Sequence, residues 1–162
     1  MNPHPLRTIL FDLDGTLTDP KVGIVTSVRY AMAKMKRPLS PEINLEWCIG
    51  PPLQDNFAKL LQSDDAALID QAIAAFREYF AVTGLLQNEL YAGIADLLDT
   101  LGKQGLRCYV ATSKPTVYAQ KIIDHFGLSD YFVRVYGSEL SGHNAQKGAL
   151  IRHILQTEGL SA

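Results

Sequence analysis

From Gly93 onward the sequence alternates between amphipathic helical patterns and short apolar runs, and this alternation restricts the possible folds most strongly. Helical spacing of apolar residues covers 94–101, 115–126 and 147–158, and apolar runs cover 106–111 and 131–136. Short apolar runs between turn residues are typical of buried β-strands. Strands that alternate with helices usually form a parallel sheet with right-handed crossovers. The sequence therefore predicts an α/β fold.

A further apolar run lies near the N-terminus, and a long helical stretch separates it from the alternating part. Residues 7–11 form this run and lead directly into Asp-Leu-Asp-Gly, which indicates a strand ending in a turn. Apolar residues recur at spacings of three and four in 21–36 and 68–80, so residues 20–91 read as helical throughout. This insert is larger than a crossover requires. We therefore predict a helical cap over 20–91, inserted into a core made of 1–19 and 92–162.

Composition and charge limit the classes of partner. A formal charge of -2 gives no electrostatic basis for binding nucleic acid or an anionic membrane. No apolar run approaches the length of a membrane span. The two cysteines, Cys48 and Cys108, provide neither a disulfide framework nor a metal cluster. We expect a cytoplasmic protein with a small-molecule partner, and the sequence does not indicate an oligomeric state.

Two carboxylates follow the first predicted strand. Asp12 and Asp14 are two residues apart at a strand end, so both side chains can face one point in space. In a parallel sheet, that point lies at the carboxyl edge, where such folds bind ligands. Gly15 permits a sharp exit from the strand. The pair suits a hard cation such as Mg²⁺, or a nucleophile beside a proton carrier. A solvated turn after a strand is the structural alternative.

Two later elements add to this cluster. Thr112 and Ser113 end the second predicted strand where a helix begins, and hydroxyls beside free helix N–H groups form a phosphate cradle. Lys147 begins the helix after the third strand, where its charge would balance a nucleophile and a phosphoryl group. Each also has a plain explanation, since a hydroxyl there caps a helix and a lysine at a helix start is usually solvated.

The run 9–19, Ile-Leu-Phe-Asp-Leu-Asp-Gly-Thr-Leu-Thr-Asp, resembles the first signature of the haloacid dehalogenase-like hydrolase superfamily. Thr112 matches the second signature and Lys147 the third. The resemblance covers nearly the whole chain, and the segments 18–20, 50–52 and 111–115 are similar to the phosphoglycolate phosphatase and 5'-nucleotidase-like branch. It implies a Rossmann-like parallel sheet core with an inserted α-helical cap subdomain.

The resemblance also implies a role for each matching residue. Asp12 would attack phosphorus and become an aspartyl phosphate, and Asp14 would protonate the leaving group and later activate water. Thr112 and Ser113 would bind a phosphoryl oxygen, and Lys147 would balance charge at the nucleophile. The implied cofactor is Mg²⁺, held by Asp12 and Asp14.

Further residues would contact the substrate. Gly15 and Thr16 lie in the first signature, and Gly50 lies in a turn that resembles the specificity loop of the cap. A rigid helix-breaking turn is the alternative for Gly50. Candidate substrate contacts elsewhere in the cap, each alternatively solvated surface, are Arg29, Lys36, Lys59 and Arg77.

The family pattern includes a fourth signature, an acidic pair after a strand beyond Lys147, and this sequence ends at Ala162 before it. The expected core is therefore incomplete on its C-terminal side, with one edge of the first strand exposed. We expect weaker metal binding, and a chain that is weak or inactive unless a longer parent protein or another chain supplies the missing strands.

The expected activity is hydrolysis of a small phosphomonoester, with a nucleoside monophosphate favoured and phosphoglycolate or pyrophosphate next. Two alternatives remain. One is a catalytically dead fragment that binds a phosphorylated ligand or a partner protein. The other is a phosphotransferase similar to β-phosphoglucomutase. An unrelated nucleotide-binding fold is disfavoured because no glycine-rich phosphate loop follows any strand.

Overall fold

The computed structural model describes residues 7–141 and 144–160. The predicted core segments extend beyond this, since residues 1–6, 142–143 and 161–162 lie outside the described residues. The chain divides into two compact units, one of residues 19–89 and one of residues 1–18 with 90–162. That the smaller unit acts as a cap stays a prediction. Among the described residues, no helix combines the length and apolar character needed to cross a bilayer.

A parallel sheet organises the larger unit. Its strands lie in the order β1 (Thr8–Phe11), β4 (Arg107–Pro115), β5 (Arg134–Ser138), and both pairings are parallel. The parallel α/β fold predicted from the sequence is confirmed. All three strands end at the same edge of the sheet, where the chain continues into Asp12 after β1. Within the part of the chain that the structure describes, β1 pairs on one side only.

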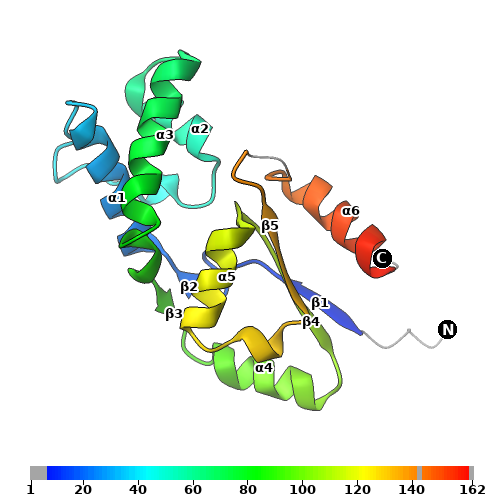
Figure 1. The fold of residues 1–162 in the computed structure, drawn as a ribbon. Coiled ribbons are helices and arrows are strands. Elements are labelled where there is room, and N and C mark those ends of the chain that lie inside the picture. The colour runs from blue at the N-terminus through cyan, green and yellow to red at the C-terminus, as the bar shows by residue number, and fades with distance from the viewer. Residues whose placement is uncertain (1–6, 142–143, 161–162) are drawn as a thin grey trace. The chain divides into compact units, whose positions relative to one another are not determined.

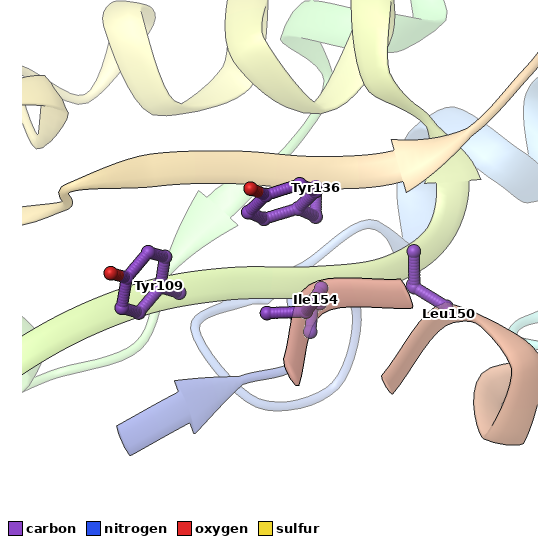
Figure 2. Close-up of a cluster of buried hydrophobic side chains, with 5 residues drawn as sticks. Tyr109, Tyr136, Leu150 and Ile154 are labelled. Carbon is purple, nitrogen blue, oxygen red and sulfur yellow. The ribbon is translucent and has the colours of Figure 1, made fainter. Parts of the chain in front are cut away.

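Helices cover both faces of this sheet. The helices are α4 (Ile94–Lys103), α5 (Thr116–His125) and α6 (Lys147–Glu158), and Figure 1 shows α5 and α6 on opposite sides of the strands. Figure 2 shows Leu150 and Ile154 of α6 facing the strands β4 and β5, and both belong to one buried cluster with Tyr109 of β4 and Tyr136 of β5. This packing fixes the position of α6, and therefore the position of its first residue, Lys147.

The smaller unit is mainly helical. Its elements are α1 (Lys21–Lys34), η1 (Glu46–Cys48), α2 (Leu53–Leu61), α3 (Ala66–Phe80) and η2 (Gly84–Leu86). Gly23 allows α1 to approach η2, because a Cβ atom at this position would lie 2.0 Å from the carbonyl oxygen of Gly84. Arg29 of α1 donates to the carbonyl oxygens of Ser40, Pro41 and Ile43, so its guanidinium holds the loop after α1.

Four boundaries differ from the prediction. The second strand runs on to Pro115, because Pro115 pairs with Ser138 after a register shift. The third strand begins at Arg134, since residues 129–131 form a 3-10 turn. Helix α3 begins at Ala66, before the predicted spacing over 68–80, because the Asp65 carboxylate caps it and accepts from the N–H of Ala67 at 2.9 Å. Residues 20–91 are not helical throughout, since β3 (Glu89–Leu90) forms a two-stranded sheet with β2 (Thr18–Asp19).

Candidate active site

The turn after β1 holds its two carboxylates in a fixed frame. The side chains of Leu13 and Leu17 are fully buried and anchor the turn in the core. The N–H groups of Thr16, Leu17 and Thr18 all donate to the carbonyl oxygen of Leu13, at 3.2, 2.9 and 3.1 Å. Gly15 has a φ of 77°, a left-handed conformation that glycine adopts without steric cost. The backbone on both sides of Leu13 is therefore immobilised.

Asp12 is paired with Lys147. Its Oδ2 lies 2.7 Å from the Lys147 ammonium, and its Oδ1 accepts from the N–H of Leu13 at 2.8 Å. Lys147 also donates to the carbonyl oxygen of Ala111 at 2.9 Å, which ties it to β4 where the register with β5 shifts. Both charged side chains keep about two-fifths of their surface exposed, 40% for Asp12 and 39% for Lys147. The carboxylate is therefore charge-balanced and still accessible to a ligand.

Asp14 is paired with a residue that the sequence did not single out. Its Oδ2 lies 3.0 Å from the ammonium of Lys114, and the two side chains are 15% and 7% exposed. Its Oδ1 is buried and accepts no hydrogen bond from the residues that the structure describes. The available signal was the position of Lys114 in Thr-Ser-Lys-Pro, two residues after Thr112.

The Thr112 loop is held from the neighbouring strand. Thr112 is buried, and its hydroxyl accepts from the N–H of Lys114 at 3.2 Å. Buried Ser138, the last residue of β5, donates its hydroxyl to the carbonyl oxygen of Ser113 at 2.9 Å. The structure thus places Thr112 and Ser113 at the same sheet edge as the two carboxylates.

The predicted contacts Gly15, Thr16 and Gly50 lie on turns. Gly15 and Thr16 are exposed beyond Asp14. Gly50 is exposed in the smaller unit, where it follows η1 and has a φ of 102°, a left-handed conformation that suits a tight turn. Its part in a specificity loop stays a prediction. Arg29 is engaged by three backbone carbonyls, which supports a structural role for this candidate.

The cysteines do not provide an alternative nucleophile. Both are buried in the structure, as expected for Cys108. Burial raises the pKa of the Cys48 thiol to about 11 and also raises the pKa of the Cys108 thiol. Since the thiolate is the reactive form, burial makes both thiols less reactive.

The donor atoms at the sheet edge suit a hard cation. Asp12 offers carboxylate oxygens on a side chain that stays 40% exposed, and Asp14 adds acidic oxygen donors two residues further along the same turn. Within residues 7–141 and 144–160, no three acidic, histidine or cysteine side chains group into a metal site. Mg²⁺ nevertheless often binds through one or two carboxylates, with water and substrate phosphate as the other ligands. The two aspartates therefore fit Mg²⁺.

Residues 9–162 match the family model described as haloacid dehalogenase-like hydrolase. The chain belongs to this hydrolase family. The family and the hydrolase class expected from the signatures are confirmed.

Proteins similar to this chain include a named 5'-nucleotidase and a predicted phosphatase. The 5'-nucleotidase of Pseudomonas aeruginosa is 47% identical over 154 residues, which are 95% of this chain and 69% of the relative. The crystal structure of a predicted phosphatase from Clostridium acetobutylicum matches with a TM-score of 0.90 at 37% identity, over 96% of this chain and 72% of that one.

One relative has a different named activity. The tyrosine-protein kinase PtkA of Mycobacterium tuberculosis is 36% identical over 150 residues. The match covers 92% of this chain, which spans only half the length of the kinase.

Proposed function

We propose that this chain carries the catalytic machinery of a phosphomonoester hydrolase that works through an aspartyl phosphate at Asp12. The pairing of Asp12 with Lys147 supports this proposal most directly. A nucleophilic carboxylate must approach a dianionic phosphoryl group, and the ammonium 2.7 Å away offsets that repulsion. The fixed turn places a second carboxylate, Asp14, two residues further on.

The reaction divides into two displacements at phosphorus. In the first, a carboxylate oxygen of Asp12 forms a bond to phosphorus while the bond to the leaving oxygen breaks, and Asp14 gives that oxygen a proton. In the second, water attacks the phosphorus of the acyl phosphate, Asp14 takes the proton of that water, and the Asp12 carboxylate is released. Lys147 balances charge in both steps, and Thr112 with Ser113 binds a phosphoryl oxygen.

Magnesium would supply charge stabilisation for the phosphoryl oxygens when bound. The carboxylate of Asp12 would hold it, together with Asp14, whose backbone carbonyl would be a further oxygen ligand. The chain's own residues orient the nucleophile and move the proton.

A nucleoside monophosphate is the favoured substrate, with phosphoglycolate or pyrophosphate next. The relative from Pseudomonas aeruginosa, named 5'-nucleotidase, supports the first place of the nucleoside monophosphate. A panel of these compounds, assayed by phosphate release, ranks them by kcat/KM.

The kinase relative favours one alternative, in which a hydroxyl group rather than water accepts the phosphoryl group. Aspartyl phosphate chemistry allows both acceptors, since each attacks the same phosphorus. Product analysis separates them, because hydrolysis yields inorganic phosphate and transfer yields a new phosphate ester.

The proposal is tested by phosphate release from nucleoside monophosphates in the presence and absence of Mg²⁺. Asp12→Asn should abolish release, whereas Asp130→Asn, a matched change in an exposed turn, should leave it unchanged. Chelation should stop the wild-type reaction and added Mg²⁺ should restore it. Equal activity of Asp12→Asn and the wild type would refute the proposal.

A further inference from the structure

Lys114 forms an ion pair with Asp14, the residue predicted to carry the proton. We infer that Lys114 is a positioning residue for Asp14: its ammonium holds Oδ2, so that Oδ1 is the oxygen that exchanges a proton with the substrate. This inference rests on the proposed function, since it concerns the step in which Asp14 protonates the leaving oxygen. Neither the spacing of the signatures nor the family match assigns Lys114 a role.

The two oxygens of Asp14 have different surroundings. Oδ2 lies 3.0 Å from the Lys114 ammonium, whereas Oδ1 is buried and accepts no hydrogen bond within the described part of the chain. A buried polar atom without a partner is unfavourable unless a ligand uses it. The ion pair with Oδ2 therefore fixes the rotation of the Asp14 carboxylate and leaves Oδ1 for the substrate.

Burial separates the tasks of the two lysines. The Lys147 side chain is 39% exposed and is therefore accessible to a phosphoryl group, but the Lys114 side chain is only 7% exposed. A cation that binds substrate directly needs access to it. Since charge pairs strengthen as water is excluded, the Lys114 ammonium constrains Asp14 more strongly than a surface lysine would.

The backbone of Lys114 is itself fixed. Its N–H donates to the Thr112 hydroxyl at 3.2 Å, and the neighbouring Pro115 pairs with Ser138 of β5. A Cβ atom on Gly137 would lie 2.3 Å from the Lys114 carbonyl oxygen, so β5 approaches this residue as closely as glycine permits. Contacts with β5 thus fix the backbone position of Lys114, and the ion pair in turn fixes the position of the Asp14 carboxylate.

The test compares two substrates with different leaving groups. An alkyl phosphate has a poor leaving oxygen that needs the proton, whereas p-nitrophenyl phosphate has a good one that needs it little. Lys114→Met should therefore lower kcat/KM for the alkyl phosphate at least about tenfold more than for the aryl phosphate, since misplaced catalytic groups lose rate steeply. Lys103→Met, a matched change at a side chain 75% exposed, should alter neither value.

A double-mutant comparison makes the result specific to Asp14. In an Asp14→Asn background the proton carrier is already lost, so Lys114→Met should cause no further change in the ratio of the two kcat/KM values. Equal losses for both substrates, or an unchanged ratio, would overturn the inference. If thermal unfolding shows that Lys114→Met is not folded, Lys114→Gln is measured in its place.

A crystal structure of the Lys114→Met protein gives a readout that needs no turnover. The Asp14 carboxylate should adopt a different rotamer or become disordered while Asp12 keeps its bond to the Leu13 N–H. An unchanged Asp14 would overturn the inference even if the enzyme is active. If the wild type hydrolyses neither substrate, the proposed function fails, and the rotamer of Asp14 still decides the positioning role.

Discussion

The Lys147 ammonium bridges Asp12 Oδ2 at 2.7 Å and the carbonyl oxygen of Ala111 at 2.9 Å. This one side chain therefore connects the start of α6 to the end of β1 and to the middle of β4. It lies where a phosphoryl group on Asp12 would carry its charge. The position depends on the packing of α6, whose Leu150 and Ile154 are buried against the sheet.

Removing the Lys147 charge should slow phosphoryl transfer. Lys147→Met keeps most of the apolar stem, and we expect kcat/KM to fall roughly 100-fold, as for the loss of one preorganised donor at a reacting centre. Lys121→Met on the exposed side of α5 is the control and should have no effect. Steady-state kinetics with a phosphomonoester measure both. A loss below about threefold would contradict the role of Lys147.

A methyl group on Gly137 should destabilise the fold. In Gly137→Ala the new Cβ would lie 2.3 Å from the Lys114 carbonyl oxygen and 2.7 Å from the Thr116 nitrogen, so the backbone must shift. We expect a loss of about 1–3 kcal/mol in the free energy of unfolding. Gly102→Ala in α4 meets no atom within 4 Å and should instead add up to about 1 kcal/mol. Urea denaturation compares them, and equal effects would refute the prediction.

Glu158 should make stability depend on acid pH. Hydrogen bonds from Tyr136 and Tyr109, at 2.6 and 2.8 Å, lower the pKa of Glu158 below its ordinary value of 4.5, and Arg134 and Arg107 lie nearby. A lowered pKa contributes stability that is present above about pH 4.5 and is lost as pH falls through the lowered value. Glu158→Gln should therefore be less stable than the wild type at pH 7, and the difference should shrink in acid. Urea midpoints across this range measure it, and a constant difference would contradict the prediction.

Arg29 should matter for stability rather than catalysis. Its guanidinium donates to three carbonyl oxygens of the loop after α1. Arg29→Met should lower the free energy of unfolding by about 1 kcal/mol, because exposed hydrogen bonds contribute modestly. Its kcat/KM should equal that of the wild type. A rise in KM with unchanged stability would instead show that Arg29 contacts substrate.

Local patterns were enough to predict most of the fold. The helical spacing in 147–158 and the apolar run before Asp12 predict α6 and β1 closely, because both signals lie within one element. The third strand was placed three residues too early. Its last residue, Ser138, is not apolar and belongs to the strand because it pairs with Pro115, a residue far away in the sequence.

The candidate site likewise has a part that the sequence predicts and a part that only the structure shows. Asp12 and Asp14 stand out locally, because the strand and the glycine turn are adjacent to them. The pair of Lys114 with Asp14 joins residues one hundred positions apart and depends on the register of β1 with β4. No spacing rule within one segment indicates which lysine reaches which carboxylate. This contact therefore required the structure.

Chemical trapping at residue 12 tests the central claim most directly. The protein is mixed with Mg²⁺ and substrate, quenched during turnover and treated with borohydride, which reduces an acyl phosphate to the alcohol. Peptide mass spectrometry should then find homoserine in place of Asp12, and none in the Asp12→Asn protein. Turnover without homoserine at position 12, or with the reduced residue at another position, would contradict the account.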